Sequence, residues 1–101
     1  MNYRTRIEII SQILEIANGE NATRTRIMYK AFLSYVQLKD YLKILTENDL
    51  FEYDSKSRTF KTTEIGLGFL KTYDQLDDIM KKEQKDNNNS VHRKDSSDSK
   101  S

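Results

Sequence analysis

Residues 34–53, SYVQLKDYLKILTENDLFEY, place a helix and a strand next to each other in a short chain. Ser34 is followed three residues later by Gln37, which is the capping-box arrangement that begins many helices. The apolar residues that follow recur at helical spacing and share one face; they are Leu38, Tyr41, Leu42 and Leu45. The stretch ends in LFEY, where apolar and polar residues alternate as in a strand. We therefore expect helices and strands together, with this helix covering a core on one side and exposing the other.

Two further helices are predicted before Ser34. Residues 3–18 carry a broad apolar stripe at helical spacing, and Gly19 ends it because glycine readily adopts the left-handed conformation after a helix. The stripe consists of Ile7, Ile10, Leu14 and Ala17, widened by Ile9, Ile13 and Ile16. Thr23 caps a second, short helix, whose inward positions are Ile27, Met28 and Ala31. Two short helices joined by a tight turn predict a helix-turn-helix.

A hairpin and a long helix follow. In DLFEYDSKSRTFKTT two short alternating segments flank the polar run DSKSR, which predicts two strands joined by a turn. A hairpin after three helices is the wing of a winged helix. Thr63 is suited to cap a last helix, in which Phe69, Tyr73, Leu76 and Met80 follow spacings typical of a coiled coil. From residue 85 onward Val91 is the one apolar residue, so we expect a disordered polar tail.

The core must be thin, because only 36% of the 101 residues are apolar. The length indicates one small domain, and domains of this kind often need a metal, disulfides or a partner chain. There is no cysteine and only one histidine, so disulfides and a His/Cys metal site are excluded. Of these ways to complete a thin core, oligomerisation remains. Most aromatic side chains should lie in this core; the set is Tyr29, Phe32, Tyr41, Phe51, Tyr53, Phe60, Phe69 and Tyr73, with Tyr35 as the exception.

Several classes of function are disfavoured by the residues present. The chain shows no signal peptide and no apolar run that would span a bilayer, so we expect a cytoplasmic, nucleoid-associated protein without membrane contact. Catalysis is not expected, since His92 lies in the polar tail and Gly66 and Gly68 lack a phosphate-loop pattern. No cofactor, metal or small-molecule ligand is expected. The net charge of +1 favours no partner, but basic residues outnumber acidic ones up to Thr62.

The local sequences RTRIEIISQIL, TRTRIMYKAFLSYVQLKDYLKIL and TTEIGLGFLKTY resemble a family of small archaeal winged-helix proteins, described as chromatin-associated or regulator-like DNA-binding proteins. The resemblance covers residues 4 to 80 and leaves the tail outside. It implies a winged helix with a long final helix that pairs with its twofold mate as an antiparallel coiled coil. The expected domains are 1–62 for DNA binding, 63–84 for dimerisation and 85–101 as the tail.

The candidate contacts with DNA lie on the predicted third helix and among the basic residues around it. The start of such a helix enters the major groove, where Gln37 matches an adenine edge and Val36 a thymine methyl group, while basic residues hold phosphates. The full set is Arg4, Arg6, Arg24, Arg26, Ser34, Tyr35, Val36, Gln37, Lys39, Lys43, Lys56 and Arg58. A solvated face of mixed charge is the competing interpretation, and Asp40 supports it because phosphates repel a carboxylate.

The sequence thus predicts a mainly α fold with a small β-hairpin, a winged helix-turn-helix followed by a long C-terminal helix. The expected function is duplex DNA binding as a homodimer, in transcriptional regulation or chromosome organisation. The predicted dimer contacts are Phe69, Tyr73, Leu76, Ile79 and Met80. The alternative is a winged-helix protein-interaction module that does not bind DNA.

Overall fold

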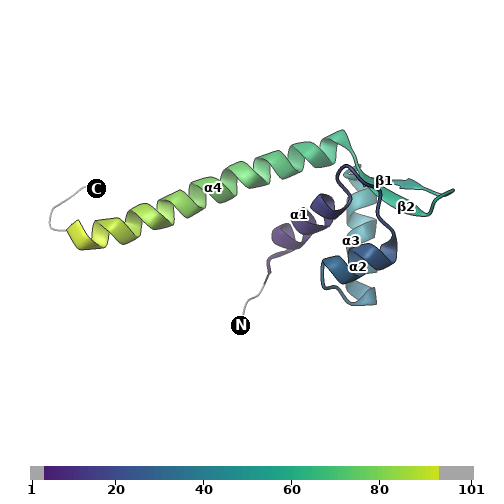
Figure 1. The fold of residues 1–101 in the computed structure, drawn as a ribbon, viewed down its shortest axis with the longest axis horizontal. Helices are drawn as coiled ribbons and strands as arrows, with labels where there is room; N and C mark the ends of the chain where they lie inside the picture. The colour runs from purple at the N-terminus through teal and green to yellow at the C-terminus, as the bar shows by residue number, and fades with distance from the viewer. Residues whose placement is uncertain (1–3, 94–101) are drawn as a thin grey trace. The chain divides into compact units, whose positions relative to one another are not determined.

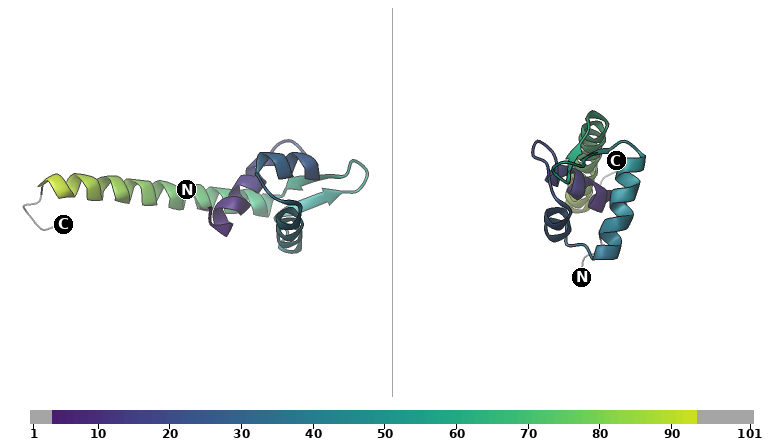
Figure 2. Two further views of the ribbon diagram at one scale, coloured as in Figure 1. Left: turned by 90° about the horizontal axis from the view of Figure 1, so that it is seen from below. Right: turned by 90° about the vertical axis from the view of Figure 1, so that its right-hand side faces the viewer.

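The computed structural model describes the backbone of residues 4–93 and the side chains of residues 4–83. The elements in chain order are α1 (Arg6–Ile16), α2 (Arg24–Lys30), α3 (Tyr35–Glu47), β1 (Phe51–Asp54), β2 (Thr59–Thr62) and α4 (Glu64–Arg93) (Figure 1). Figures 1 and 2 show α1, α2 and α3 grouped together, with the turn of the hairpin directed away from them. The chain forms two compact units, residues up to Lys71 and residues from Thr72 onward. The predicted winged helix-turn-helix with a long last helix is confirmed.

Side-chain caps set the starts of the helices. In α1 the Thr5 hydroxyl accepts from the Glu8 N–H at 3.1 Å, and the Glu8 carboxylate accepts from the Thr5 N–H at 2.8 Å. The predicted capping box of Ser34 with Gln37 is confirmed in α3, at 3.2 and 2.9 Å. Thr63 caps α4 as predicted, since its hydroxyl accepts from the Gly66 N–H. These bonds satisfy N–H groups that have no partner within a helix.

The turn between α2 and α3 contains an unusual backbone conformation. The N–H groups of Phe32 and Leu33 donate to the carbonyls of Tyr29 and Met28, which is the Schellman arrangement at a helix end. Phe32 has a φ of +56°, in the left-handed region where glycine is normally found, and its side chain is 82% exposed. Ala31 is buried beside it. The turn therefore holds a bulky residue in a strained backbone, with its ring in solvent.

The hairpin is attached to the helices through β2. β1 and β2 pair antiparallel from Phe51 opposite Thr62 to Asp54 opposite Thr59. Phe60 exchanges two backbone hydrogen bonds with Ala22, just before α2, at 2.8 and 2.9 Å. The buried Thr62 hydroxyl donates to the Leu14 carbonyl of α1 at 2.7 Å. The wing is thus joined by hydrogen bonds to α1 and to the segment that leads into α2.

The core of the first unit is aliphatic with a few aromatic rings. Its largest fully buried side chains are Ile13, Leu14, Ile27, Leu38 and Leu45. The prediction that most aromatic residues lie in the core is only partly correct. Tyr41, Phe51 and Phe60 are buried and Phe69 packs against the core, Tyr73 is half-buried, and Tyr29, Phe32 and Tyr53 are exposed.

One member of the predicted α1 stripe also faces outward. Ile7 is 49% exposed, whereas Ile10, Ile13, Leu14 and Ala17 are buried. Ile7 lies in the first turn of α1, and the buried residues of this helix begin at Ile9. Helical spacing identified the correct face but not where along the helix its burial begins.

The start of α4 approaches the rest of its unit closely at Gly66. A Cβ atom added there would lie 2.5 Å from the Leu50 carbonyl oxygen and 2.7 Å from the Thr62 Cγ2 atom. Gly68 has no atom within 4 Å of the same position. Of the two glycines in the first turns of α4, only Gly66 lies where a side chain would collide with its neighbours.

The last helix extends further than expected. α4 runs to Arg93, whereas the sequence predicted a helix ending near residue 84. Lys81, Lys82, Glu83 and Lys85 are strong helix formers, which favours continuation beyond the last apolar residue. Lys81 donates to Asp77 at 3.0 Å one turn away, and this hydrogen bond raises the pKa of the Lys81 ammonium. Residues 94–101 of the expected tail lie outside the described residues.

The contrast between the two glycines of α4 makes a stability test. We expect Gly66→Ala to lower the free energy of unfolding by about 1–3 kcal/mol, because backbone and packed side chains must move aside. Gly68→Ala is the matched control and should raise stability by about 1 kcal/mol, since alanine favours a helix. Thermal unfolding followed by circular dichroism measures both. An equal gain in both variants would contradict the close approach at Gly66.

A second stability prediction concerns Phe32. Phe32→Gly should stabilise the unit by about 1 kcal/mol, because glycine adopts a positive φ without steric cost. Phe32→Ala keeps a Cβ atom while removing the exposed ring, so it should give little gain. If chemical denaturation shows that both variants change stability equally, the backbone at residue 32 is not the source of strain.

Candidate nucleic-acid interface

The outer side of α3 is exposed along most of its length. Leu38, Tyr41, Leu42 and Leu45 are buried, and the side chains on the opposite side of the helix face solvent. At the start of the helix Tyr35 is 63% exposed and Val36 is 67% exposed. Exposed charged residues continue along the same side; they are Lys39, Asp40, Lys43 and Glu47. The surface has apolar and aromatic groups at its first turn and mixed charge beyond.

Ser34 and Gln37 already have structural partners. The Ser34 hydroxyl and the Gln37 side-chain oxygen each accept a backbone N–H in the capping box of α3. An adenine amino group would have to share that amide oxygen with the Ser34 N–H, or replace it. Both residues lie at the predicted position, but their side chains hold the end of α3 in this structure.

Arg24 connects α2 to the hairpin. Its guanidinium carbon lies 5.2 Å from the Tyr53 ring centre and 5.1 Å from the Phe60 ring centre. Cation–π contacts of this kind contribute about 0.5–1 kcal/mol at exposed sites. Arg26 is exposed two residues further along α2. Arg24 therefore helps to hold the wing and still reaches solvent, whereas Arg26 extends from the helix surface.

Arg4 and Arg6 are placed differently from each other. Arg4 is half-buried, and its guanidinium donates to the carbonyls of Ala31 and Phe32 and to the Gln12 side chain, at 2.6 to 3.1 Å. It thereby caps the C-terminal end of α2. Arg6 is exposed, with its guanidinium 5.1 Å from the Tyr41 ring centre. Of this predicted pair, Arg4 has a structural role in the helix-turn-helix, a role that no local pattern indicated.

The basic residues of the hairpin lie at its turn. Asp54 organises this turn, because its carboxylate accepts from the Lys56 N–H at 3.0 Å and from the Ser57 hydroxyl at 3.1 Å. Arg58 closes the turn with a φ of +57°. The Lys56 and Arg58 side chains are both exposed. The structure thus brings two cations to the tip of the wing, where the sequence placed them.

The cations of this surface are not neutralised by neighbouring carboxylates. Within residues 4–83 there is one ion pair, between Lys81 and Asp77 on α4. The basic residues of α2, α3 and the hairpin form none in that part of the chain. The surface therefore offers unpaired positive charge, although the net charge of the protein is nearly zero.

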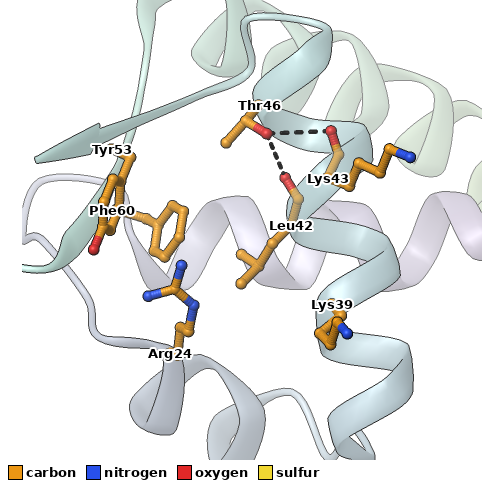
Figure 3. A pocket seen from close by; sticks show the side chains of 7 residues that line it. All are labelled: Arg24, Lys39, Leu42, Lys43, Thr46, Tyr53 and Phe60. Carbon is orange, nitrogen blue, oxygen red and sulfur yellow. Dashed lines mark hydrogen bonds between the residues drawn. The ribbon is translucent and has the colours of Figure 1, made fainter. Parts of the chain in front are cut away.

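A cavity lies between α3 and the hairpin, and no pattern in the sequence predicted it. Its volume is about 480 Å³. It is lined by Arg24, Lys39, Leu42, Lys43, Thr46, Tyr53 and Phe60. Figure 3 shows Tyr53 and Phe60 on the hairpin side, Arg24 rising from α2, and the others on α3. We call it the α3–hairpin cavity. Periodicity separates inward from outward residues, but it does not reveal a gap between elements distant in sequence.

The predicted dimer contacts divide between the two units. Phe69 belongs to the first unit, where it packs against that unit's own core. In the second unit Leu76, Ile79 and Met80 are exposed, and Tyr73 is half-buried. The part of the chain with described side chains holds no group of three or more potential metal ligands. None of its helices is long and apolar enough to cross a membrane.

Comparison with known proteins agrees with this architecture. Residues 3–81 match the family model of winged helix-turn-helix proteins. An uncharacterized protein of Methanocaldococcus jannaschii is 30% identical over 77 residues, which cover 76% of this chain and 77% of that protein. The crystal structure of Sso10a-2, a DNA-binding protein from Sulfolobus solfataricus, superposes with a TM-score of 0.78 at 19% identity. That match covers 93% of this chain and all of the other, and it shows a shared fold.

The relatives are archaeal, as the resemblance of the local sequences implied. The family model spans all three helices of the first unit, the hairpin and the first half of α4. The chain therefore belongs to the winged helix-turn-helix family.

Proposed function

We propose that this protein binds duplex DNA as a homodimer, with α3 in the major groove and the wing beside it. The observation that carries the proposal is the outer side of α3. Exposed Tyr35 and Val36 stand at its first turn, and the exposed cations of α2 and the wing form no ion pair in the part of the chain with described side chains. In helix-turn-helix proteins the start of this helix meets base edges while flanking basic residues hold phosphates. The fold shared with a DNA-binding archaeal protein supports the same function.

The structure refines which residues we assign to which role. Arg26, Lys56 and Arg58 are exposed and have no structural role that would restrict them, so we assign them to phosphates. Lys39 and Lys43 extend the positive charge along α3. We assign Arg4 a structural role in the helix-turn-helix, because its guanidinium already donates to the Ala31 and Phe32 carbonyls at the end of α2. Binding of this type serves either transcriptional regulation or chromosome organisation.

The dimer is proposed from the second unit. Leu76, Ile79 and Met80 form a row of exposed apolar side chains on α4. Their spacing places them on neighbouring turns of one side of the helix, where a second copy would cover them. An apolar row left in water favours association. Twofold pairing through this helix would supply two recognition helices for adjacent half-sites.

A second candidate function is a protein-interaction module. Tyr29 is 71% exposed beside the even more exposed Phe32, and both lie outside the surface assigned to DNA. Asp40 and Glu47 add negative charge to α3. If no random duplex is bound even at low salt, this alternative is preferred.

The DNA-binding proposal predicts that replacing Arg26 weakens binding in a salt-dependent, sequence-independent way. Arg26→Glu should weaken binding to every duplex on the order of tenfold. The magnitude of the slope of log affinity against log salt concentration should fall by about 1 for each phosphate that the protein no longer neutralises. Fluorescence anisotropy with random duplexes at several salt concentrations measures both. Lys71→Glu, the same charge change at an exposed position of α4, is the control. Equal weakening in both variants would show that Arg26 does not contact DNA.

The dimer proposal predicts that Leu76→Asp yields monomers, because a carboxylate buried in an apolar seam without a partner is strongly unfavourable. Gln75→Asp introduces the same carboxylate at the neighbouring exposed position and should leave the dimer intact. Sedimentation equilibrium measures the mass of each variant. A dimer that survives Leu76→Asp places the interface elsewhere.

A further inference from the structure

We infer that the α3–hairpin cavity binds a small amphipathic anion, an aromatic ring or short hydrocarbon carrying one carboxylate, and that the bound anion competes with DNA. The binding step depends only on the cavity. The competition step rests on the proposed function, because it requires that DNA use the same cations.

The apolar part of such a ligand has a defined surface to cover. Leu42 of α3 and Phe60 of β2 are buried for most of their surface and line the cavity from opposite sides. The Tyr53 ring lies 4.7 Å from the Phe60 ring, centre to centre, and it remains partly exposed. Small-molecule sites are typically hollows of this volume with apolar and aromatic walls and a few polar groups.

The charged part would meet Arg24. Its guanidinium carbon lies 5.2 Å from the Tyr53 ring centre and 5.1 Å from the Phe60 ring centre, so the two rings hold the group beside the hairpin. A guanidinium edge pairs two N–H groups with the two oxygens of a carboxylate. No ion pair satisfies Arg24 in the part of the chain with described side chains. The cavity thus combines a fixed anion donor with an apolar wall.

The remaining lining residues exclude other classes of ligand. Lys39 and Lys43 lie one turn apart on α3, and no carboxylate lines the cavity. A metal cation would meet only like charge. A neutral apolar molecule would leave Arg24 unpaired. Lys43 is a lining residue, but in Figure 3 its side chain extends away from Arg24, so its ammonium group is directed away from the Arg24 guanidinium.

The cavity and the proposed DNA interface share Arg24, Lys39 and Lys43. A carboxylate seated on Arg24 would neutralise charge there, and its apolar body would stand between α3 and the wing. By thermodynamic linkage, an anion that weakens DNA binding must itself be bound more weakly, by the same factor, when DNA is present. Release of DNA by a small anion would be a regulatory function of this surface.

The first experiment uses the full chain without DNA. 4-Phenylbutyrate is titrated into the protein by calorimetry and by ¹H–¹⁵N NMR, with acetate and the neutral 4-phenylbutanol as matched probes. We expect 4-phenylbutyrate to shift the amide signals of Leu42, Lys43 and Tyr53, and to bind at least tenfold more tightly than either matched probe. Absence of binding, or equal binding of the alcohol, overturns the proposed anion site.

Variants locate the site. Arg24→Gln keeps a polar side chain and removes the charge, and Lys30→Gln removes the same charge from the same helix outside the cavity. Thr46→Phe fills the cavity and keeps every cation. We expect Arg24→Gln and Thr46→Phe each to weaken the binding of 4-phenylbutyrate at least fivefold. Lys30→Gln should leave its binding unchanged. Circular dichroism confirms that each variant is folded. Unchanged affinity in folded Arg24→Gln overturns the assignment to this cavity.

The second experiment adds duplex DNA at constant ionic strength. 4-Phenylbutyrate should weaken DNA binding in proportion to its occupancy, whereas acetate at the same concentration should not. Ligand binding with unchanged DNA affinity overturns the competition. If the protein binds no duplex under any condition, the proposed function fails, while the titrations without DNA still decide whether the cavity is an anion site.

Discussion

The position of Phe60 determines much of the rest of this structure. Its backbone N–H and carbonyl both pair with Ala22, which fixes the hairpin against the segment leading into α2. Its ring packs 5.6 Å from Phe51 and 4.7 Å from Tyr53, and it supports the Arg24 guanidinium. Together with the bond from the Thr62 hydroxyl to the Leu14 carbonyl, Phe60 therefore sets the distance between the wing and the helices. That distance defines the α3–hairpin cavity and the spacing of the cations around α3.

The sequence predicted the elements well because the signals that define them are local. Ser34 with Gln37, Thr23 and Thr63 mark helix starts through bonds to N–H groups three residues away, and the structure contains all of them. Apolar spacing identified the buried side of α3 for the same reason. What defines a helix lies within a few residues of it, so a single sequence carries that information.

The site was less predictable because some side chains that were assigned to DNA have partners within the protein. Arg4 was expected at phosphates, yet it caps α2 through carbonyls of Ala31 and Phe32. Gln37 was expected to read a base, yet the capping box that predicted the helix also occupies its oxygen. The exposure of Phe32 follows from a turn geometry that overrides its hydrophobicity. The outcomes for Arg4 and Phe32 depend on tertiary contacts or on backbone geometry that residue type alone does not reveal, whereas the capping role of Gln37 was already indicated by the sequence.

The attachments of β2 also have a consequence for the order in which the chain folds. Its bonds to Ala22 and to the Leu14 carbonyl join residues distant in sequence, whereas the N-terminal caps of α1, α2 and α3 are local. Local contacts form quickly, while distant ones must first overcome the entropy of closing a loop. We therefore expect the helical scaffold to assemble early and docking of the hairpin to limit the folding rate. A newly made chain would possess α3 before it possesses the wing that completes the proposed DNA-binding surface.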